Sequence, residues 1–260
     1  MDTDPKLMEK EAHLSLSQER FDEAYRLFRK AGLIYKERAN HAESALCLAS
    51  AGSAWSLKSG EKAFYNSAKS YEEAARQAEE FVDLEYASLL YRHAAIGYER
   101  DTEFINFSEC FYRSKECYRK FLTLSLVNPK KIHRMTKGEE PGGIKGLFRR
   151  IFLWLGITFS SLVWGHGERP ARTFYSGIFL VFLSAFFYRH GCLFKDGAAF
   201  RPDFFEALYF SVITFTTVGY GDITPIGFSK AVVMIEAFCG LFIVPIFIFG
   251  HDDKRNRNIK

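Results

Sequence analysis

Residues Thr217 to Gly221 read Thr-Val-Gly-Tyr-Gly, a string whose backbone could coordinate a dehydrated cation. A cation that leaves water needs fixed oxygen atoms in place of its hydration shell, and backbone carbonyls can supply them. To aim successive carbonyls in one direction, a strand must place some residues at positive φ, which glycine adopts freely. Gly219 and Gly221 permit this geometry. If several chains met at one axis, rings of carbonyls would form from Thr217, Val218, Gly219 and Tyr220.

The segment before this string, residues 203–216, is apolar with two acids near its start, and it follows Pro202. We predict a helix here, capped by Asp203. Its length would be about 21 Å, too short to cross the roughly 30 Å hydrocarbon layer. Non-helical backbone at membrane depth is tolerated where it is buried in protein or lines a watery cavity. The segment therefore indicates a re-entrant pore helix, against the alternative of a soluble core helix followed by an ordinary glycine turn.

Two longer apolar segments flank the pore helix. Residues 229–250 would make a helix of about 33 Å, and Glu236 is its only acid. Residues 173–190 would make about 27 Å of helix, with Arg189 reaching back to the interface. Both are long enough to span a bilayer. The order of span, half-helix, glycine loop and span predicts a complete pore unit.

With these motifs in place, residues 173–250 resemble the pore of two-transmembrane potassium channels. The resemblance implies an outer helix at 173–190, a pore helix at 203–216, a selectivity filter at 217–221 and an inner helix at 229–250. It also implies a homotetramer that conducts K⁺ passively. K⁺ would be a permeant ligand held by the filter carbonyls, and we expect no resident cofactor.

The resemblance assigns supporting roles around the filter. Asp222 matches an acid that steadies the carbonyl ring through the pore helix, and Thr216 joins that helix to the filter. Tyr209 and Phe210 match an aromatic pair that packs behind the filter. Because an acid inside a span is costly unless it is paired, we also expect Glu236 to bond pore-helix hydroxyls such as Ser211 or Thr214.

The inner helix contains residues that suit a gate. Gly240 matches the glycine at which this helix bends in the family, and Pro245 lacks a backbone donor, so we predict a bend between them. The cavity or gate would be lined by Leu241, Val244 and Ile248. The chain has no arginine-rich helix of the voltage-sensor type, so we do not expect steep voltage gating by that mechanism.

Basic residues predict the orientation. Residues 127–172 carry nine Lys and Arg, the tail 251–260 carries four, and the stretch 189–230 between the spans also carries four. The excess of positive charge around both outer ends of the pore unit predicts a multi-pass protein of the cell membrane with cytoplasmic termini. The filter would then face the outside.

Residues 151–164 are apolar, but alone they would form only about 21 Å of helix. A crossing here would place seven basic residues outside, so we interpret the segment as a helix in the inner interface, anchored by Trp154 and Trp164. The alternative is a third span. The surrounding linker, 127–172, could bind anionic lipid headgroups, or its charge could serve topology alone.

Residues 1–126 differ in composition and repeat internally. They show helical periodicity with one proline, and small residues recur at intervals near forty, which corresponds to a pair of helices with its turns. One set recurs at intervals of 44 and 42 residues: Ala24 with Ala31, Ala68 with Ala75, and Cys110 with Cys117. A second set pairs Ala45, Leu46, Ala51 and Gly52 with Ser88, Leu89, Ala94 and Ala95. We predict a cytoplasmic α-solenoid of about six helices, and hence an all-α fold for the whole chain.

The solenoid segments YKERANHAESALCLASAGSAW and SAKSYEEAARQAEEF are similar to the tetratricopeptide-like helices of soluble NSF attachment proteins. This resemblance implies a concave face for a protein partner. The alternative is a packing domain that stabilises the tetramer and binds nothing. A second reading of the whole chain is a membrane-tethered oligomeric adaptor, in which the pore unit only anchors the solenoid.

Other classes find no support in the sequence. It contains no phosphate-binding or dinucleotide-binding glycine motif, no nucleophile elbow and no metal-spaced His and Cys, so we expect neither an enzyme nor a nucleic-acid partner. The five cysteines are odd in number and unpaired by spacing. The first residues mix acids and bases without an apolar core, so we expect no cleavable signal peptide.

Overall fold

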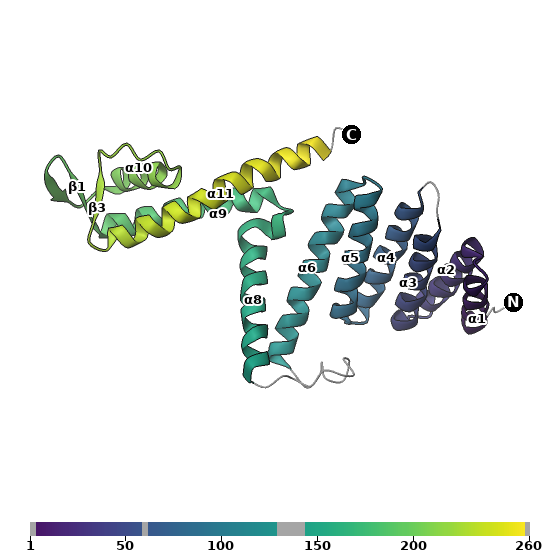
Figure 1. The fold of residues 1–260 in the computed structure, drawn as a ribbon. Helices are drawn as coiled ribbons and strands as arrows, with labels where there is room; N and C mark the ends of the chain where they lie inside the picture. The colour runs from purple at the N-terminus through teal and green to yellow at the C-terminus, as the bar shows by residue number, and fades with distance from the viewer. Residues whose placement is uncertain (1–3, 59–61, 129–143, 258–260) are drawn as a thin grey trace. The chain divides into compact units, whose positions relative to one another are not determined.

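The computed structural model describes residues 4–58, 62–128 and 144–257 (Figure 1). By its internal contacts the chain divides into two compact units, residues 1–159 and 160–260. The division falls inside the predicted linker of residues 127–172. The described chain is mostly helical.

The first unit contains six consecutive helices that pack on their sequence neighbours, as Figure 1 shows. Short turns join them, and the same turn geometry recurs: a residue at positive φ, such as Glu19, Ala39, Val82 or Thr102, ends one helix shortly before the next begins. The helices are α1 (Pro5–Ser17), α2 (Phe21–Glu37), α3 (His41–Leu57), α4 (Ala63–Glu80), α5 (Leu84–Arg100) and α6 (Phe104–Val127).

The small residues singled out in the sequence fall on alternate helices. The first set lies on α2, α4 and α6, and all six of its side chains are buried: Ala24, Ala31, Ala68, Ala75, Cys110 and Cys117. Their spacing therefore corresponds to a helix pair, as the interval near forty residues predicts. The assignment of these helices to a tetratricopeptide-like family stays a prediction.

Close helix contacts in this unit depend on glycine. A Cβ atom at Gly97 would come within 2.8 Å of the Ala68 Cβ. The Ser44 hydroxyl donates to the Gly32 carbonyl at 2.8 Å, and the Ser67 hydroxyl donates to the Gly52 carbonyl at the same distance. Larger side chains at these positions would separate neighbouring helices, so the unit's small residues set how closely its helices pack.

The remaining helices are long and apolar. Within the described residues, three segments are long and apolar enough to cross a membrane: Gly146–Gly167, Pro170–His190 and Ser229–Ile246. They belong to α8 (Ile144–Trp164) with the short helix η1 (Gly165–Gly167), to α9 (Pro170–His190) and to α11 (Ser229–Arg257). A shorter apolar helix, α10 (Phe204–Phe215), lies between α9 and α11 in sequence and packs on both.

The structure corrects two expectations about these elements. The helix expected at 151–164 begins at Ile144 and has 21 residues, so the premise that it is too short to cross a membrane was wrong. The inner helix continues past residue 250 to Arg257, into the predicted tail 251–260. The sequence missed both extensions because charged residues border them, and charge ends an apolar pattern without ending a helix.

The all-α prediction also missed a small antiparallel sheet in the second unit. Its strands are β1 (Cys192–Lys195), β2 (Ala198–Phe200) and β3 (Thr224–Ile226), in the order β2-β1-β3. In the register, Leu193 lies opposite both Phe200 and Pro225. The sheet joins the segment after α9 to the segment after the glycine string, and the fully buried Leu193 fixes it to the core.

The core of the second unit forms where α9, α10 and β1 meet. Ala185 and Tyr188 from α9 pack with Ala207 and Phe210 from α10, and all four are buried. The Tyr188 and Phe210 rings meet edge to face with centroids 4.9 Å apart. This core positions the short helix α10 and the glycine string that follows it.

Candidate functional site

Helix α10 begins with a complete capping box. The Asp203 side chain accepts from the Glu206 amide at 2.7 Å, and the Glu206 side chain accepts from the Asp203 amide at 3.2 Å. These bonds satisfy two of the free N–H groups at a helix start. The predicted cap at Asp203 is confirmed, with α10 running from Phe204 to Phe215.

Helix α10 ends in a tight cap that leads directly into the glycine string. The Thr217 amide donates to the Thr214 carbonyl and the Val218 amide to the Ile213 carbonyl, both at 3.0 Å. This pair of bonds is a Schellman motif, which requires a left-handed residue just beyond the helix. Thr217 occupies that position at φ 58°. For a β-branched residue this conformation is strained, and such strain persists where the surrounding structure imposes it.

The two glycines of the string adopt the backbone that the sequence predicts. Gly219 has φ 52° and Gly221 has φ 78°. A Cβ atom at either position would meet nothing within 4 Å, so the need for glycine is one of backbone conformation and not of space. Thr217 to Gly221 are exposed in the single chain, with Val218 53% and Tyr220 73% accessible.

Two side chains of α10 were expected to support the string, and they act differently. The Tyr209 hydroxyl donates to the Asp222 carboxylate at 2.9 Å and so ties the residue after the string to α10. Phe210 points the other way and packs edge-on against Tyr188 of α9. Thr216 donates through its hydroxyl to the Val212 carbonyl at 2.7 Å and is exposed.

Glu236 is fully buried and joins three helices. It accepts a hydrogen bond from Ser211 of α10 and another, at 2.5 Å, from the Tyr188 hydroxyl of α9. Ser184 of α9 contributes a third side-chain bond. The expected bond to Ser211 is present, whereas Thr214 is not among the hydrogen-bond partners of Glu236 in the described residues. The sequence did not signal Tyr188, whose hydroxyl completes the cluster.

At Gly240, α11 lies very close to the backbone of α10. A Cβ atom here would come within 2.2 Å of the Phe215 carbonyl oxygen, inside the last turn of α10. Gly177 of α9 also faces Phe215, because a Cβ atom there would meet the ring at 3.2 Å. The structure therefore gives Gly240 a packing role that its expected role as a bend did not include.

The other predicted gate residues lie along α11. Pro245 is inside the helix. Leu241 is exposed and Val244 is half-buried. Ile248 lies in α11, but its side chain is outside the described residues. A role for these residues in a gate stays a prediction.

The junction between α8 and α9 contains contacts that the sequence analysis did not predict. The structure shows that two side chains of α9 bond the last turn of α8: Arg172 donates to the Ser161 carbonyl at 2.8 Å, and Ser176 donates to the Val163 carbonyl at 2.9 Å. Within η1, His166 has a positive φ of 59° and bonds Ser160 at 3.1 Å. Carbonyls at a helix end need partners, and here they fasten α8 to α9.

Comparison with known proteins assigns the second unit to a class. Residues 176–250 match the model of a family described as ion channel, so this part of the chain is an ion channel domain. The match contains α10, the glycine string, Asp222, Glu236 and Gly240.

A curated relative supports the same assignment. A stretch of 48 residues is 45% identical to a protein of Methanocaldococcus jannaschii named "Probable potassium channel protein 2". The stretch covers 18% of this chain and 14% of that protein, so most of each chain lies outside the similarity. No solved structure matches the chain significantly.

Proposed function

We propose that this protein is the subunit of a homotetrameric, potassium-selective channel of the cell membrane, with both termini in the cytoplasm. The observation that carries the proposal is the Thr-Val-Gly-Tyr-Gly string at the end of a half-length helix, with positive φ at Gly219 and Gly221. Four such strings around an axis would offer K⁺ successive rings of carbonyls in place of water. Conduction would be passive.

The bonds around the string support this proposal because they hold it at both ends. The Schellman motif fixes Thr217 and Val218 to α10, and the Tyr209–Asp222 bond fixes the far end to the same helix. Glu236 in turn fixes α10 to both long helices. A K⁺ ion can exchange its hydration water for carbonyl oxygens at little cost only if those oxygens are already in position. This holds whether selectivity comes from the size of the cavity or from the field strength of the carbonyl dipoles.

Gating, in this proposal, passes through the helix junction. The bonds from Arg172 and Ser176 fasten the end of α8 to the start of α9, so a movement of α8 would act on the outer helix. The helical first unit would supply that movement on binding a partner. If Ser176→Ala changes neither open probability nor its response to a bound partner, the junction is not the coupling element.

The direct test is potassium flux from liposomes. The purified full chain, reconstituted in potassium-loaded vesicles, should release K⁺ in a barium-sensitive manner without comparable sodium flux. Valinomycin added at the end confirms that the vesicles retained potassium. Equal sodium and potassium flux would contradict selectivity, and silence with intact vesicles would favour the adaptor reading, in which the pore unit serves as an anchor.

A matched pair of glycine variants makes this test specific. Gly219 and Gly227 have φ of 52° and 55°, and a Cβ atom would meet nothing within 4 Å at either position. Gly219→Ala and Gly227→Ala therefore impose the same backbone strain, inside and outside the string. We expect Gly219→Ala to remove potassium selectivity and Gly227→Ala to preserve it. Equal effects of the two variants would mean that the string has no special role.

A further inference from the structure

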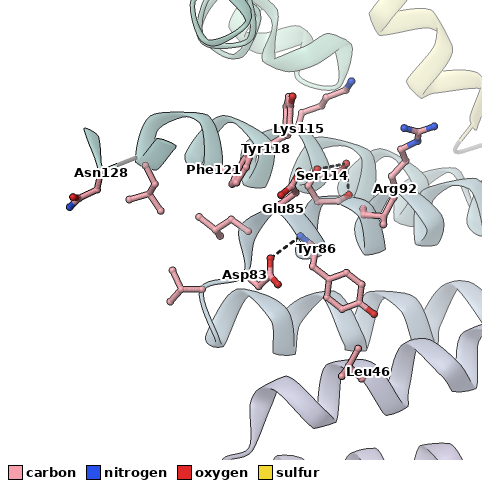
Figure 2. A pocket seen from close by; sticks show the side chains of 15 residues that line it. Leu46, Asp83, Glu85, Tyr86, Arg92, Ser114, Lys115, Tyr118, Phe121 and Asn128 are labelled. Carbon is pink, nitrogen blue, oxygen red and sulfur yellow. Dashed lines mark hydrogen bonds between the residues drawn. The ribbon is translucent and has the colours of Figure 1, made fainter. Parts of the chain in front are cut away.

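The first unit carries an open groove that the channel proposal does not use (Figure 2). Its volume is about 860 Å³, and it is formed by α5, α6, the turn between α4 and α5, and Leu46 of α3. Along α6 the lining extends from Ser114 to Leu124 and on to Asn128, which corresponds to about 20 Å of helix. The groove is thus elongated, and its length matches a short helix better than a compact small molecule.

The walls of the groove are apolar and exposed. Four aliphatic side chains that line it are between 40% and 55% accessible: Leu46, Val82, Leu89 and Leu124. Tyr118 and Phe121 add stacked rings, with centroids 6.1 Å apart. A contiguous exposed apolar patch of this kind is typical of an interaction site.

Two polar side chains that line the groove, Ser114 and Asp83, already have hydrogen-bond partners within the chain. The Ser114 hydroxyl donates to the Ser88 carbonyl at 2.8 Å. The Asp83 carboxylate accepts from the Tyr86 amide at 3.1 Å and caps α5. Neither group needs a ligand. Glu85, in the first turn of α5, is a second acid of the lining, so the acids lie toward the turn and a partner would meet apolar walls between the two ends.

The opposite end of the groove is cationic. Arg92 and Lys115 extend from either side of Ser114, far from Asn128, as Figure 2 shows. Both are exposed, and among the described residues neither forms an ion pair with a carboxylate. The Lys115 ammonium lies 5.3 Å from the centre of the Phe111 ring. Arg92 and Lys115 lie at the end of the groove away from Asp83 and Glu85, which line it at the start of α5, so the cations favour a partner with negative charge at one end.

From this arrangement we propose that the α5–α6 groove binds an amphipathic helix of a protein partner. Its apolar face lies on Leu89, Tyr118 and Leu124, and acidic residues at one of its ends meet Arg92 and Lys115. This is the helix-in-groove mode of recognition, in which side chains at i, i+3, i+4 and i+7 occupy the groove. This inference specifies the partner that the gating proposal invokes. It is tested by binding alone, so its outcome does not depend on whether the chain conducts potassium.

The test is a selection of peptides on the full chain in nanodiscs. A displayed library of 16-residue amphipathic helices, with acidic, neutral or basic residues varied at each end, is selected against the wild-type chain. We expect enrichment of helices that are acidic at one end, and we expect Tyr118→Ala combined with Leu89→Ser to abolish it. No enrichment, or enrichment that this groove variant leaves unchanged, would overturn the proposal.

Charge reversal then tests the cationic end. With an enriched acidic peptide labelled for fluorescence anisotropy, Arg92→Glu combined with Lys115→Glu should weaken binding at least tenfold and select basic peptides instead. The matched control is Arg26→Glu with Lys30→Glu, two exposed cations of α2 outside the groove, which should leave binding unchanged. Equal weakening by both pairs, or selection of apolar helices without acidic bias, would contradict the assigned chemistry. Unchanged helical circular dichroism confirms that the variants are folded.

Discussion

The two units of this chain differ in where their large apolar side chains lie. In the helical unit, contacts between neighbouring helices use alanine and glycine, and residues such as Phe28, Leu48 and Tyr91 are fully buried. In the channel unit, large side chains of the long helices remain exposed, with Phe179 of α9 67% and Phe238 of α11 65% accessible. The first unit has its own core and also exposes apolar side chains at the α5–α6 groove. The second exposes large aromatic side chains along its long helices.

In this chain, the residues proposed to act on ions are exposed in the single subunit, so burial within one chain does not identify them. The helical unit pairs many of its buried polar groups, as in the bond from the Tyr98 hydroxyl to Glu72 at 2.8 Å. The channel unit bonds its fully buried acid, Glu236, to hydroxyls of α9 and α10, and it presents its candidate filter at the surface. Its function depends on what surrounds it, so variants should act on assembly as well as on folding.

The largest effect should come from filling the closest helix contact in the channel unit. Gly240→Ala would place a Cβ atom 2.2 Å from the Phe215 carbonyl oxygen, which is backbone and cannot turn aside. Overpacking costs about 3 kcal/mol at such a site. We expect loss of the assembled oligomer and of potassium flux, measured by gel filtration in detergent and by the liposome assay. The corresponding change in the helical unit, Gly97→Ala, should lower that unit's melting temperature and leave the oligomer intact.

The control for this pair is Gly156→Ala on α8, where a Cβ atom would meet nothing within 4 Å. This variant should behave as wild type in both assays. A Gly240→Ala protein with normal assembly and flux would show that α10 and α11 do not approach each other as described.

The next effect in size should be a loss of stability of the helical unit at alkaline pH. Burial raises the pKa of the Cys47 thiol in the helical unit to about 12, from 9.0 for an exposed thiol. Burial and the carboxylate of Glu72 likewise raise the pKa of Tyr98. Because each folded pKa is raised, the stabilisation is complete below pH 9 and is lost as pH rises toward 12. We expect the free energy of unfolding to fall by at least about 2 kcal/mol over this range.

Thermal melts of the full chain in detergent between pH 8 and 11.5, followed by circular dichroism, measure this change. Cys47→Ala removes one titrating group and should reduce the slope of stability against pH. A stability that stays constant to pH 11.5 would contradict the prediction.

The Glu236 cluster should show an intermediate effect. Glu236→Ala leaves the Tyr188 hydroxyl buried without its acceptor, which costs about 2 kcal/mol, whereas Ser211 can still donate to the Val181 carbonyl at 2.8 Å. We expect an oligomer that dissociates at lower temperature and a reduced, less selective potassium flux. Glu236→Gln keeps one acceptor oxygen and should be milder. If both variants match wild type in dissociation temperature, conductance and selectivity, the cluster does not support the filter.

The smallest effect should come from the bond at the outer end of the string. Tyr209→Phe removes the hydroxyl that bonds Asp222 at 2.9 Å, and an exposed bond of this kind contributes little to stability. Folding and assembly should be unchanged, while the ratio of potassium to sodium flux falls. Tyr175→Phe on α9, an exposed tyrosine distant in sequence, is the control and should retain the wild-type ratio. Identical ratios for the two variants would exclude a role for the bond in selectivity.

Much of the channel unit was predictable because its signals are local. The cap at Asp203, the half-length helix, the positive φ of Gly219 and Gly221, and the bond from Ser211 to Glu236 all follow from residue type and spacing, and the structure contains each of them. The helical periodicity of residues 1–126 likewise predicted six helices. Assembly into a tetramer, ion selectivity and the role of the gate residues remain predictions that the flux and variant experiments address.

The sequence by itself determined the chemistry available: a string that can offer carbonyls to a cation, apolar helices of the right lengths, and small residues where helices meet. Only the tertiary structure decided which distant groups came together. It paired β1 with β3 across the whole of α10, brought Tyr188 to Glu236, and placed Gly240 against the Phe215 carbonyl. The physical reason is that a residue's own conformation depends on its near neighbours in sequence, whereas its contacts depend on how helices rotate and approach when their side chains pack.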